Sequence, residues 1–97
     1  MNIVLHPAAA EELQAAATFY ANQANRQLGL ALLNEFERVV TLLAEQPALG
    51  NRWVGNTRRF ALRKFPFSVV YRSQTGLLLI VALAHHKRRP GYWRHRA

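Results

Sequence analysis

The feature that most constrains the fold is an unbroken apolar run at residues 77–84, near the end of the chain. Eight residues are far too few to cross a membrane as a helix, which takes about 20. A run of this length instead indicates a strand that is covered on both faces or paired at the centre of a sheet. Before it, Phe67, Val69 and Tyr71 alternate with other residues at the period of a strand, and residues 73–76 form a turn.

A helix is predicted in the middle of the chain, where apolar residues recur at steps of four, four, three and four. These residues are Leu28, Leu32, Phe36, Val39 and Leu43. The spacing places them on one face of a helix. The helix should end before Pro47, because the residue that precedes a proline is pushed out of the helical region. Residues 47–56 are then expected to form a loop.

An earlier helix is expected to start at Pro7, which is tolerated at the first helical position. Residues 2–6 are mostly apolar and suit a short strand ahead of it. Glu11 and Glu12 lie near the predicted helix start, where negative charge interacts favourably with the helix dipole. A polar break at residues 22–27 separates the two helices, which we expect to pair as an antiparallel hairpin with its apolar stripes covered by a sheet.

A further strand is expected at residues 59–64, so that the predicted order is strand, helix, helix and then three strands. With 97 residues, the chain is long enough for one core and too short for two, and we expect residues 1–97 to be a single domain. It has no cysteine, and residues 1–10 carry no cationic leader ahead of an apolar stretch. A cytoplasmic protein with no membrane partner is therefore expected.

Charge is distributed very unevenly along the sequence. Residues 1–50 contain two arginines and five glutamates, whereas residues 51–97 contain eleven Lys and Arg and no carboxylate. The whole excess behind the net charge of +8 therefore comes from the second half and can form one electropositive face. Such a face favours a polyanion or an acidic protein as partner.

Metal binding and a hydrolytic triad are both disfavoured. His85 and His86 are adjacent, so in a strand they point to opposite faces and cannot chelate one ion. Ser68 and Ser73 are the only serines, and neither has an acidic residue nearby in sequence that could orient a histidine. We expect no metal and no cofactor.

Arginine outnumbers lysine eleven to two, which favours specific recognition of phosphates or carboxylates, because guanidinium groups bind both in a bidentate manner. The predicted basic face, which would bind a target or an inhibitory partner, consists of Arg58, Arg59, Arg63, Lys64, Arg72, Lys87 and Arg88.

The last thirteen residues also hold candidates for metal-independent RNA cleavage, which needs a base, an acid and a cation. His86 or His85 would transfer protons, Tyr92 would act as an acid or stack on a base, and Arg89 would stabilise the phosphate. The alternative is that these side chains only cap the core. For Trp53, packing in the core is favoured over stacking on a nucleobase.

Several segments resemble the RelE/ParE toxins, in the order in which that family has them. They are residues 5–13 at the first helix, Tyr20 near its end, residues 47–50, residues 59–72, residues 81–86 and residues 89–93. The resemblance implies an α+β fold in which an antiparallel sheet carries a helical hairpin on one face. It also implies a type II toxin-antitoxin system and an acidic antitoxin that wraps the basic face.

The family resemblance implies two different targets. RelE-like members cut messenger RNA at the ribosome, and ParE-like members bind DNA gyrase. Ribonuclease members commonly have an arginine where this chain has Ser68, so the gyrase-type inhibitor is favoured here. The alternatives are a metal-independent ribonuclease with His86, Arg89 and Tyr92 as its catalytic residues, and a non-toxic nucleic-acid-binding module suggested by charge alone.

Overall fold

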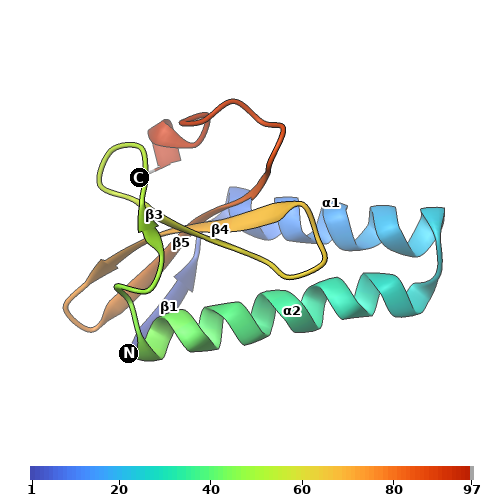
Figure 1. Cartoon of the computed structure of the whole chain (residues 1–97), viewed down its shortest axis with the longest axis horizontal. Helices are drawn as coiled ribbons and strands as arrows, with labels where there is room; N and C mark the ends of the chain where they lie inside the picture. Colours follow the sequence, from blue (N-terminus) through green and yellow to red (C-terminus); the bar gives the residue numbers. More distant parts are fainter. Residues whose placement is uncertain (97) are drawn as a thin grey trace.

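The computed structural model describes residues 1–96, and Figure 1 shows two long helices side by side against a twisted sheet. The elements in chain order are β1 (Asn2–Leu5), α1 (Pro7–Gln23), α2 (Arg26–Glu45), β2 (Asn51–Arg52), β3 (Arg58–Ala61), β4 (Phe67–Gln74), β5 (Leu77–His85) and the 3-10 helix η1 (Arg94–Arg96). None of the helices in residues 1–96 has both the length and the apolar character needed to cross a membrane. The predicted α+β class is confirmed.

The sheet has five strands in the order β1-β5-β4-β3-β2, one strand more than predicted. β2 is only two residues long and falls in the segment that was expected to be a loop. Two residues are too few to show the alternation that reveals a strand. β2 pairs antiparallel with β3, as β3 does with β4 and β4 with β5. β1 pairs with β5 in parallel, so the sheet is mixed rather than wholly antiparallel. The strand predicted at residues 59–64 is also shorter, because the chain turns at Lys64 with a φ of 66°.

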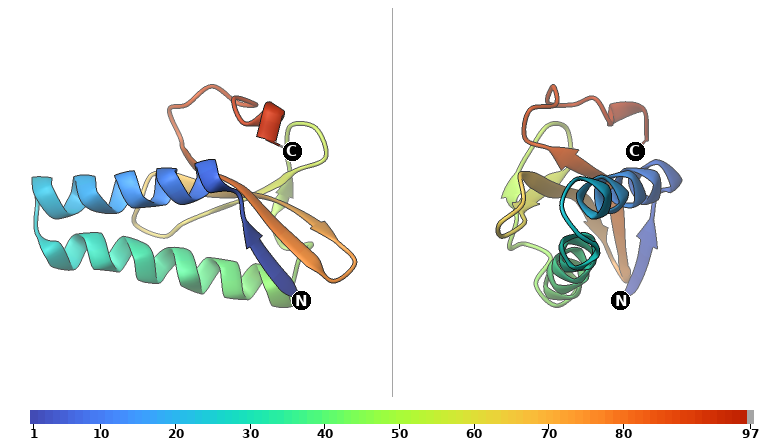
Figure 2. Two further views of the ribbon diagram at one scale, coloured as in Figure 1. Left: turned by 180° about the vertical axis from the view of Figure 1, so that it is seen from behind. Right: turned by 90° about the vertical axis from the view of Figure 1, so that its right-hand side faces the viewer.

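The helical hairpin covers one face of the sheet, as Figure 2 shows from behind and from the side. Leu32, Val39 and Leu43 of α2 are fully buried there against Val69 and Ile80 of the sheet. The apolar spacing that predicted α2 is thus the spacing of its buried face. Burying each of these large aliphatic side chains contributes about 1.5 to 3 kcal/mol, so this face contributes substantially to stability.

The opposite face of the sheet is covered in part by the C-terminal segment, residues 86–96. Trp93 is 2% exposed and packs with Val70 of β4 and with Val81 and Ala84 of β5. β5 is therefore covered on both faces, which explains its unbroken apolar sequence. β5 also pairs along both of its edges, with β1 and β4, although β4 is the middle strand of the five.

Both helices begin at a side chain that accepts a backbone hydrogen bond. His6 Nδ1 accepts from Ala8 N at 3.0 Å, directly before the helix starts at Pro7, and Asn25 Oδ1 accepts from Leu28 N at 2.8 Å at the start of α2. The first turn of α1 contains no acidic residue. The predicted interaction of Glu11 and Glu12 with the helix dipole is therefore wrong, because both lie beyond that first turn.

Replacing Asn25 by alanine is expected to lower the free energy of unfolding by about 1 kcal/mol, because the Leu28 N–H loses its acceptor at the start of α2. Urea denaturation followed by circular dichroism measures this change. Asn22→Ala is the matched control, since Asn22 is exposed inside α1 and caps no helix. Equal losses in the two variants would contradict a capping role for Asn25.

Candidate functional site

Glu12 joins helix α1 to the C-terminal part of the chain. Its Oε1 accepts from Leu83 N at 3.1 Å and from Arg96 NH1 at 2.8 Å, and its Oε2 accepts from the Tyr92 hydroxyl at 2.6 Å. The side chains of Glu12 and Arg96 are only 17% and 10% exposed. We call these four residues the Glu12 cluster. It fixes residues 92–96 against the sheet and the start of α1.

Two arginines lie close to the ring of Tyr92. The guanidinium of Arg88 lies 3.9 Å and that of Arg96 5.1 Å from the centre of the Tyr92 ring. Burial raises the pKa of the Tyr92 hydroxyl well above its usual value, and the neighbouring Glu12 carboxylate raises it further. A phenol in this position keeps its proton in neutral solution and serves as a hydrogen-bond donor.

The raised pKa of Tyr92 predicts a loss of stability in alkaline solution. Since the pKa is higher in the folded protein, the stabilisation is complete below the unfolded pKa of about 10 and is lost as the pH rises towards the folded value. The free energy of unfolding should therefore fall more steeply between pH 9 and pH 11 in the wild type than in Tyr92→Phe, as measured by urea denaturation. Parallel curves for the two proteins would contradict the assignment.

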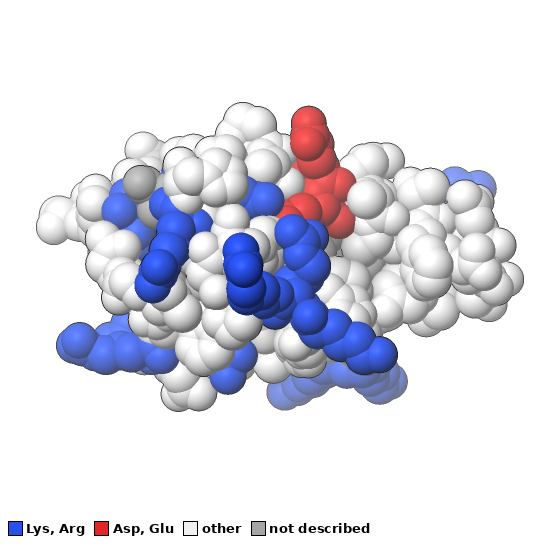
Figure 3. Space-filling view, turned by 90° about the horizontal axis from the view of Figure 1, so that it is seen from above, with Lys and Arg blue, Asp and Glu red and all other residues white. Residues whose placement is uncertain are grey.

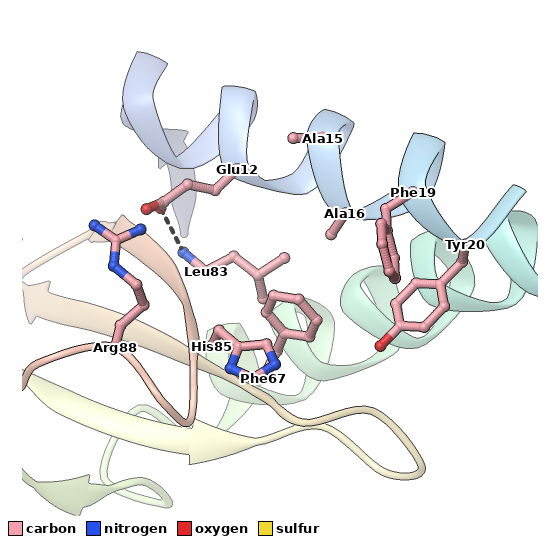
Figure 4. Close-up of a pocket in the computed structure, with 9 residues that line it drawn as sticks. All are labelled: Glu12, Ala15, Ala16, Phe19, Tyr20, Phe67, Leu83, His85 and Arg88. Atoms are coloured by element: carbon pink, nitrogen blue, oxygen red, sulfur yellow. Dashed lines mark hydrogen bonds between the residues drawn. The ribbon is translucent and has the colours of Figure 1, made fainter. Parts of the chain in front are cut away.

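An apolar groove lies beside the Glu12 cluster, between α1 and the end of the sheet. It has a volume of about 390 Å³ and is lined by Glu12, Ala15, Ala16, Phe19, Tyr20, Phe67, Leu83, His85 and Arg88. Figure 4 shows the Phe19 and Tyr20 rings on the helix side and Phe67 with His85 on the sheet side. Phe19 is 57% exposed, which is unusual for so large an apolar ring. The groove is therefore an apolar surface with charged groups at one end.

Several cations of the second half lie on the face that the C-terminal segment covers, which we call the C-terminal face, and others lie at the bend between β3 and β4, where Arg63 N donates to Glu35 Oε2 of α2 at 2.6 Å. Figure 3 shows the blue Lys and Arg atoms spread over this face, with the acidic atoms in one red patch beside them. Of the seven residues in the predicted basic face, Arg59, Arg63, Lys64, Lys87 and Arg88 are exposed. They come from β3, from the bend between β3 and β4, and from the turn after β5. The binding role of this face stays a prediction.

The other two residues of the predicted basic face are half-buried. Arg58 donates through NH1 to Gly50 O at 2.8 Å and to Ala48 O at 3.4 Å, so it holds the loop before β2. The Nε of Arg72 is buried with no hydrogen-bond partner in residues 1–96. The sequence does not distinguish these two arginines from the exposed ones, because the difference arises from long-range packing.

The three residues predicted to cleave RNA have separate surroundings. His86 Nε2 lies 3.0 Å from Ser68 Oγ, whereas Tyr92 donates to Glu12. Arg89 is exposed in the segment between them. His86 lines two cavities, and Tyr92 and Arg89 line neither of these. Their catalytic role stays a prediction, and the geometry does not gather them around one cavity.

The adjacent His85 and His86 both line one small cavity, and each also lines a second space that the other does not line. His85 packs edge-on against Phe67 in the apolar groove, with 5.0 Å between ring centres, and its Nδ1 accepts from Lys87 N. In residues 1–96 no group of three or more His, Cys, Asp or Glu is placed to hold a metal ion.

Trp53 packs on the face of the sheet opposite the helical hairpin. It is half-buried next to the cluster of Val70 and Trp93, and the Arg59 guanidinium lies 3.6 Å from its ring centre. Trp53 thus packs against the core as predicted, on the face of the sheet that the C-terminal segment covers. The loop between β2 and β3 carries it there.

Sequence reasoning missed Glu12 and Phe19 as functional candidates. In the sequence, Glu12 stands next to the exposed Glu11 and Phe19 stands next to Tyr20, so nothing local distinguishes either residue. Only the unusual exposure of Phe19 and the convergence of Glu12 with Tyr92 and Arg96 reveal them, and both depend on tertiary structure.

Comparison with known proteins gives the family. The model of the ParE toxin of type II toxin-antitoxin system, parDE, matches residues 3–90. A solved structure described as the chromosomal ParDE TA system from P. aeruginosa has a TM-score of 0.77 at 20% sequence identity, covering 88% of this chain and 95% of that chain. At this identity the likeness shows the fold alone, and no curated protein matches the chain. Because the family model spans most of the sequence, the chain belongs to the ParE toxin family of the RelE/ParE superfamily, the toxins of type II toxin-antitoxin systems.

Proposed function

We propose that the chain acts as a single-domain toxin that arrests growth by binding a cellular protein target such as DNA gyrase. A cognate acidic antitoxin then neutralises it. Membership of the ParE toxin family supports a toxin with an antitoxin partner. The fold alone does not define the target, and the kind of surface that the molecule presents supports a protein target.

The observation that carries this proposal is the apolar groove of about 390 Å³ with exposed Phe19 at its side. A groove lined mainly by aromatic and alanine side chains favours a protein ligand, because large exposed apolar surfaces mark protein interaction sites. His86 and Tyr92 lie in separate surroundings, which favours docking onto a protein over cleavage of RNA.

The same surface suits an antitoxin segment with acidic and apolar side chains. Its apolar residues would fill the groove, and its carboxylates would meet Arg88 and the other exposed arginines. Residues 51–97 contain no carboxylate that competes for these cations. Opposite charges on the two partners accelerate association and favour the correct partner. An unstructured acidic segment that folds on binding fits this surface best.

Brief expression in a bacterial host without the antitoxin tests the target. We expect growth arrest with intact transcript ends and with reduced supercoiling by gyrase. New transcript breaks with normal supercoiling would identify a ribonuclease instead and would support His86, Arg89 and Tyr92 as its catalytic residues. Normal growth would contradict toxicity of this chain and leave the nucleic-acid-binding module as the explanation of its charge.

The substitution Phe19→Arg is expected to weaken binding of the antitoxin by about tenfold or more, because it places a charge in the apolar groove. Calorimetry with the protein encoded by the adjacent gene measures the affinity. Leu30→Arg is the matched control, since Leu30 is a similarly exposed apolar residue of α2 outside this groove. If both variants bind as the wild type does, the antitoxin occupies another surface.

A further inference from the structure

A small cavity of about 70 Å³ lies on the face of the sheet that the C-terminal segment covers. Its lining includes Arg59 of β3, Ser68 of β4, His86 after β5 and Trp93 of the C-terminal segment. None of the lining residues is an Asp or a Glu. The polar groups in the lining can therefore donate hydrogen bonds or carry positive charge, and the rest of the lining is apolar.

Two of the lining residues, Ser68 and Trp93, carry a buried polar group, and only the one on Trp93 lacks a partner in residues 1–96. The indole N–H of Trp93 is buried and has no acceptor in residues 1–96. Ser68 is 5% exposed, and its hydroxyl contacts only the imidazole of His86. A buried N–H without an acceptor is unfavourable, so native proteins seldom leave one next to a cavity unless a ligand or water serves it.

The Arg59 side chain at this cavity is held in place by a stacking contact that needs no ligand. The Arg59 guanidinium lies 3.6 Å above the Trp53 ring, which also lines the cavity. Stacking of this kind restricts the side chain while leaving the N–H edges of the guanidinium free for hydrogen bonds. The second arginine in the lining, Arg88, is stacked on Tyr92 in the same manner.

The size of the cavity limits the ligand. One water needs about 10 to 15 Å³ of such space, so a cavity of about 70 Å³ holds a group of a few heavy atoms. Ala84 of β5 forms part of its wall. A phosphate group has this size and offers acceptors in several directions, whereas a carboxylate offers them in one plane only.

A larger hollow of about 530 Å³ adjoins these residues. Arg59, Ser68 and His86 line both spaces, and the hollow adds Asn51 and the aromatic ring of Phe60. An organic group attached to a phosphate in the small cavity would have room there. The pair of spaces therefore suits a phosphate ester better than a free inorganic ion.

We propose that the small cavity is a binding site for the phosphate group of a phosphate ester. Its ligands are Arg59, the Trp93 indole N–H and the Ser68 hydroxyl, which can donate to the phosphate while it accepts from His86 Nε2. The site lies on the opposite face of the sheet from the helical hairpin, and it shares His85 and Arg88 with the lining of the apolar groove. It does not depend on the target of the proposed toxin. No chemical step is assigned to it.

Proton-nitrogen NMR spectra of the full chain test the site. The chain has two tryptophans, and a Trp53→Phe sample assigns the remaining indole signal to Trp93. We expect thymidine 5′-monophosphate to shift the Trp93 indole signal saturably at constant ionic strength, and inorganic phosphate to do so with lower affinity. Thymidine and sodium acetate should leave the signal unchanged.

Arg59→Gln should weaken binding of thymidine 5′-monophosphate by about tenfold or more, because a charge-assisted hydrogen bond is lost. Arg59 is exposed, so the variant should fold normally. Arg52→Gln is the matched control, since it removes the same charge from the neighbouring strand outside the cavity and should keep the affinity within about twofold.

Three results would overturn the proposal. The first is no saturable shift with either phosphate probe, and the second is an equal shift with thymidine. The third is an equal loss of affinity in the two arginine variants, which would indicate attraction by net charge alone. If inorganic phosphate bound as tightly as the nucleotide, the phosphate cavity would stand and the role of the adjoining hollow would be wrong.

Discussion

Replacing Glu12 by alanine should lower the free energy of unfolding by about 3 to 5 kcal/mol, the loss expected when one partner of a buried ion pair is removed. The Arg96 guanidinium would stay buried without its carboxylate, and Leu83 N and the Tyr92 hydroxyl would lose their acceptor. The protein can relieve this only by releasing residues 92–96 from the sheet. Trp93 would then become exposed, and its fluorescence should shift to longer wavelength.

The neighbouring residue provides the control for this experiment. Glu11 carries the same charge on the same helix and is exposed. Glu11→Ala should therefore change stability by less than about 0.5 kcal/mol, as ordinary surface substitutions do. Urea denaturation followed by fluorescence and circular dichroism compares the two variants. If Glu12→Ala were no less stable than Glu11→Ala, the Glu12 cluster would not hold the C-terminal segment in place.

Replacing Gly50 by alanine should cost at least about 3 kcal/mol, through crowding and through lost hydrogen bonds. A Cβ at Gly50 would lie 2.5 Å from the Tyr71 hydroxyl and 2.8 Å from Arg59 O. That hydroxyl is buried, accepts from Gly50 N at 2.8 Å and donates to Pro47 O at 2.7 Å. Tyr71 therefore fastens the loop after α2 to β4, and an added methyl group displaces it.

Two further variants separate the causes of this loss. Tyr71→Phe removes the hydrogen bonds without crowding and should cost about 1 to 3 kcal/mol, because it leaves Gly50 N and Pro47 O unpaired. Gly55→Ala meets no atom within 4 Å but forces a φ of 70° on alanine, so it should cost about 1 kcal/mol. A loss in Gly50→Ala no larger than in Gly55→Ala would contradict crowding against Tyr71.

Most of the helical hairpin could be predicted from the sequence. The spacing of apolar residues from Leu28 to Leu43 predicted the buried face of α2, and Pro7 predicted the start of α1. The shorter a strand is, the harder it was to predict. β5 was clear from its apolar run, whereas the two residues of β2 become a strand only by pairing with β3.

The candidate site was predicted less well than the fold. The lopsided charge correctly indicated that the second half of the chain carries the cations, but it did not separate Arg58, which holds a loop, from Arg59, which is exposed. Glu12 was assigned to the dipole of its own helix. Its partners lie 71 to 84 residues away, beyond the reach of any local pattern.

The sequence by itself determined the two helices, the apolar strand β5, the basic character of the second half and the family resemblance that the ParE model bears out. Each of these depends on residue types within a few positions of one another, where periodicity, proline and charge act directly. The tertiary structure alone decided the parallel pairing of β1 with β5, the Glu12 cluster, the exposed Phe19 groove and the cavity at Trp93. These depend on contacts between distant segments, and such contacts form only when the whole chain packs around one core.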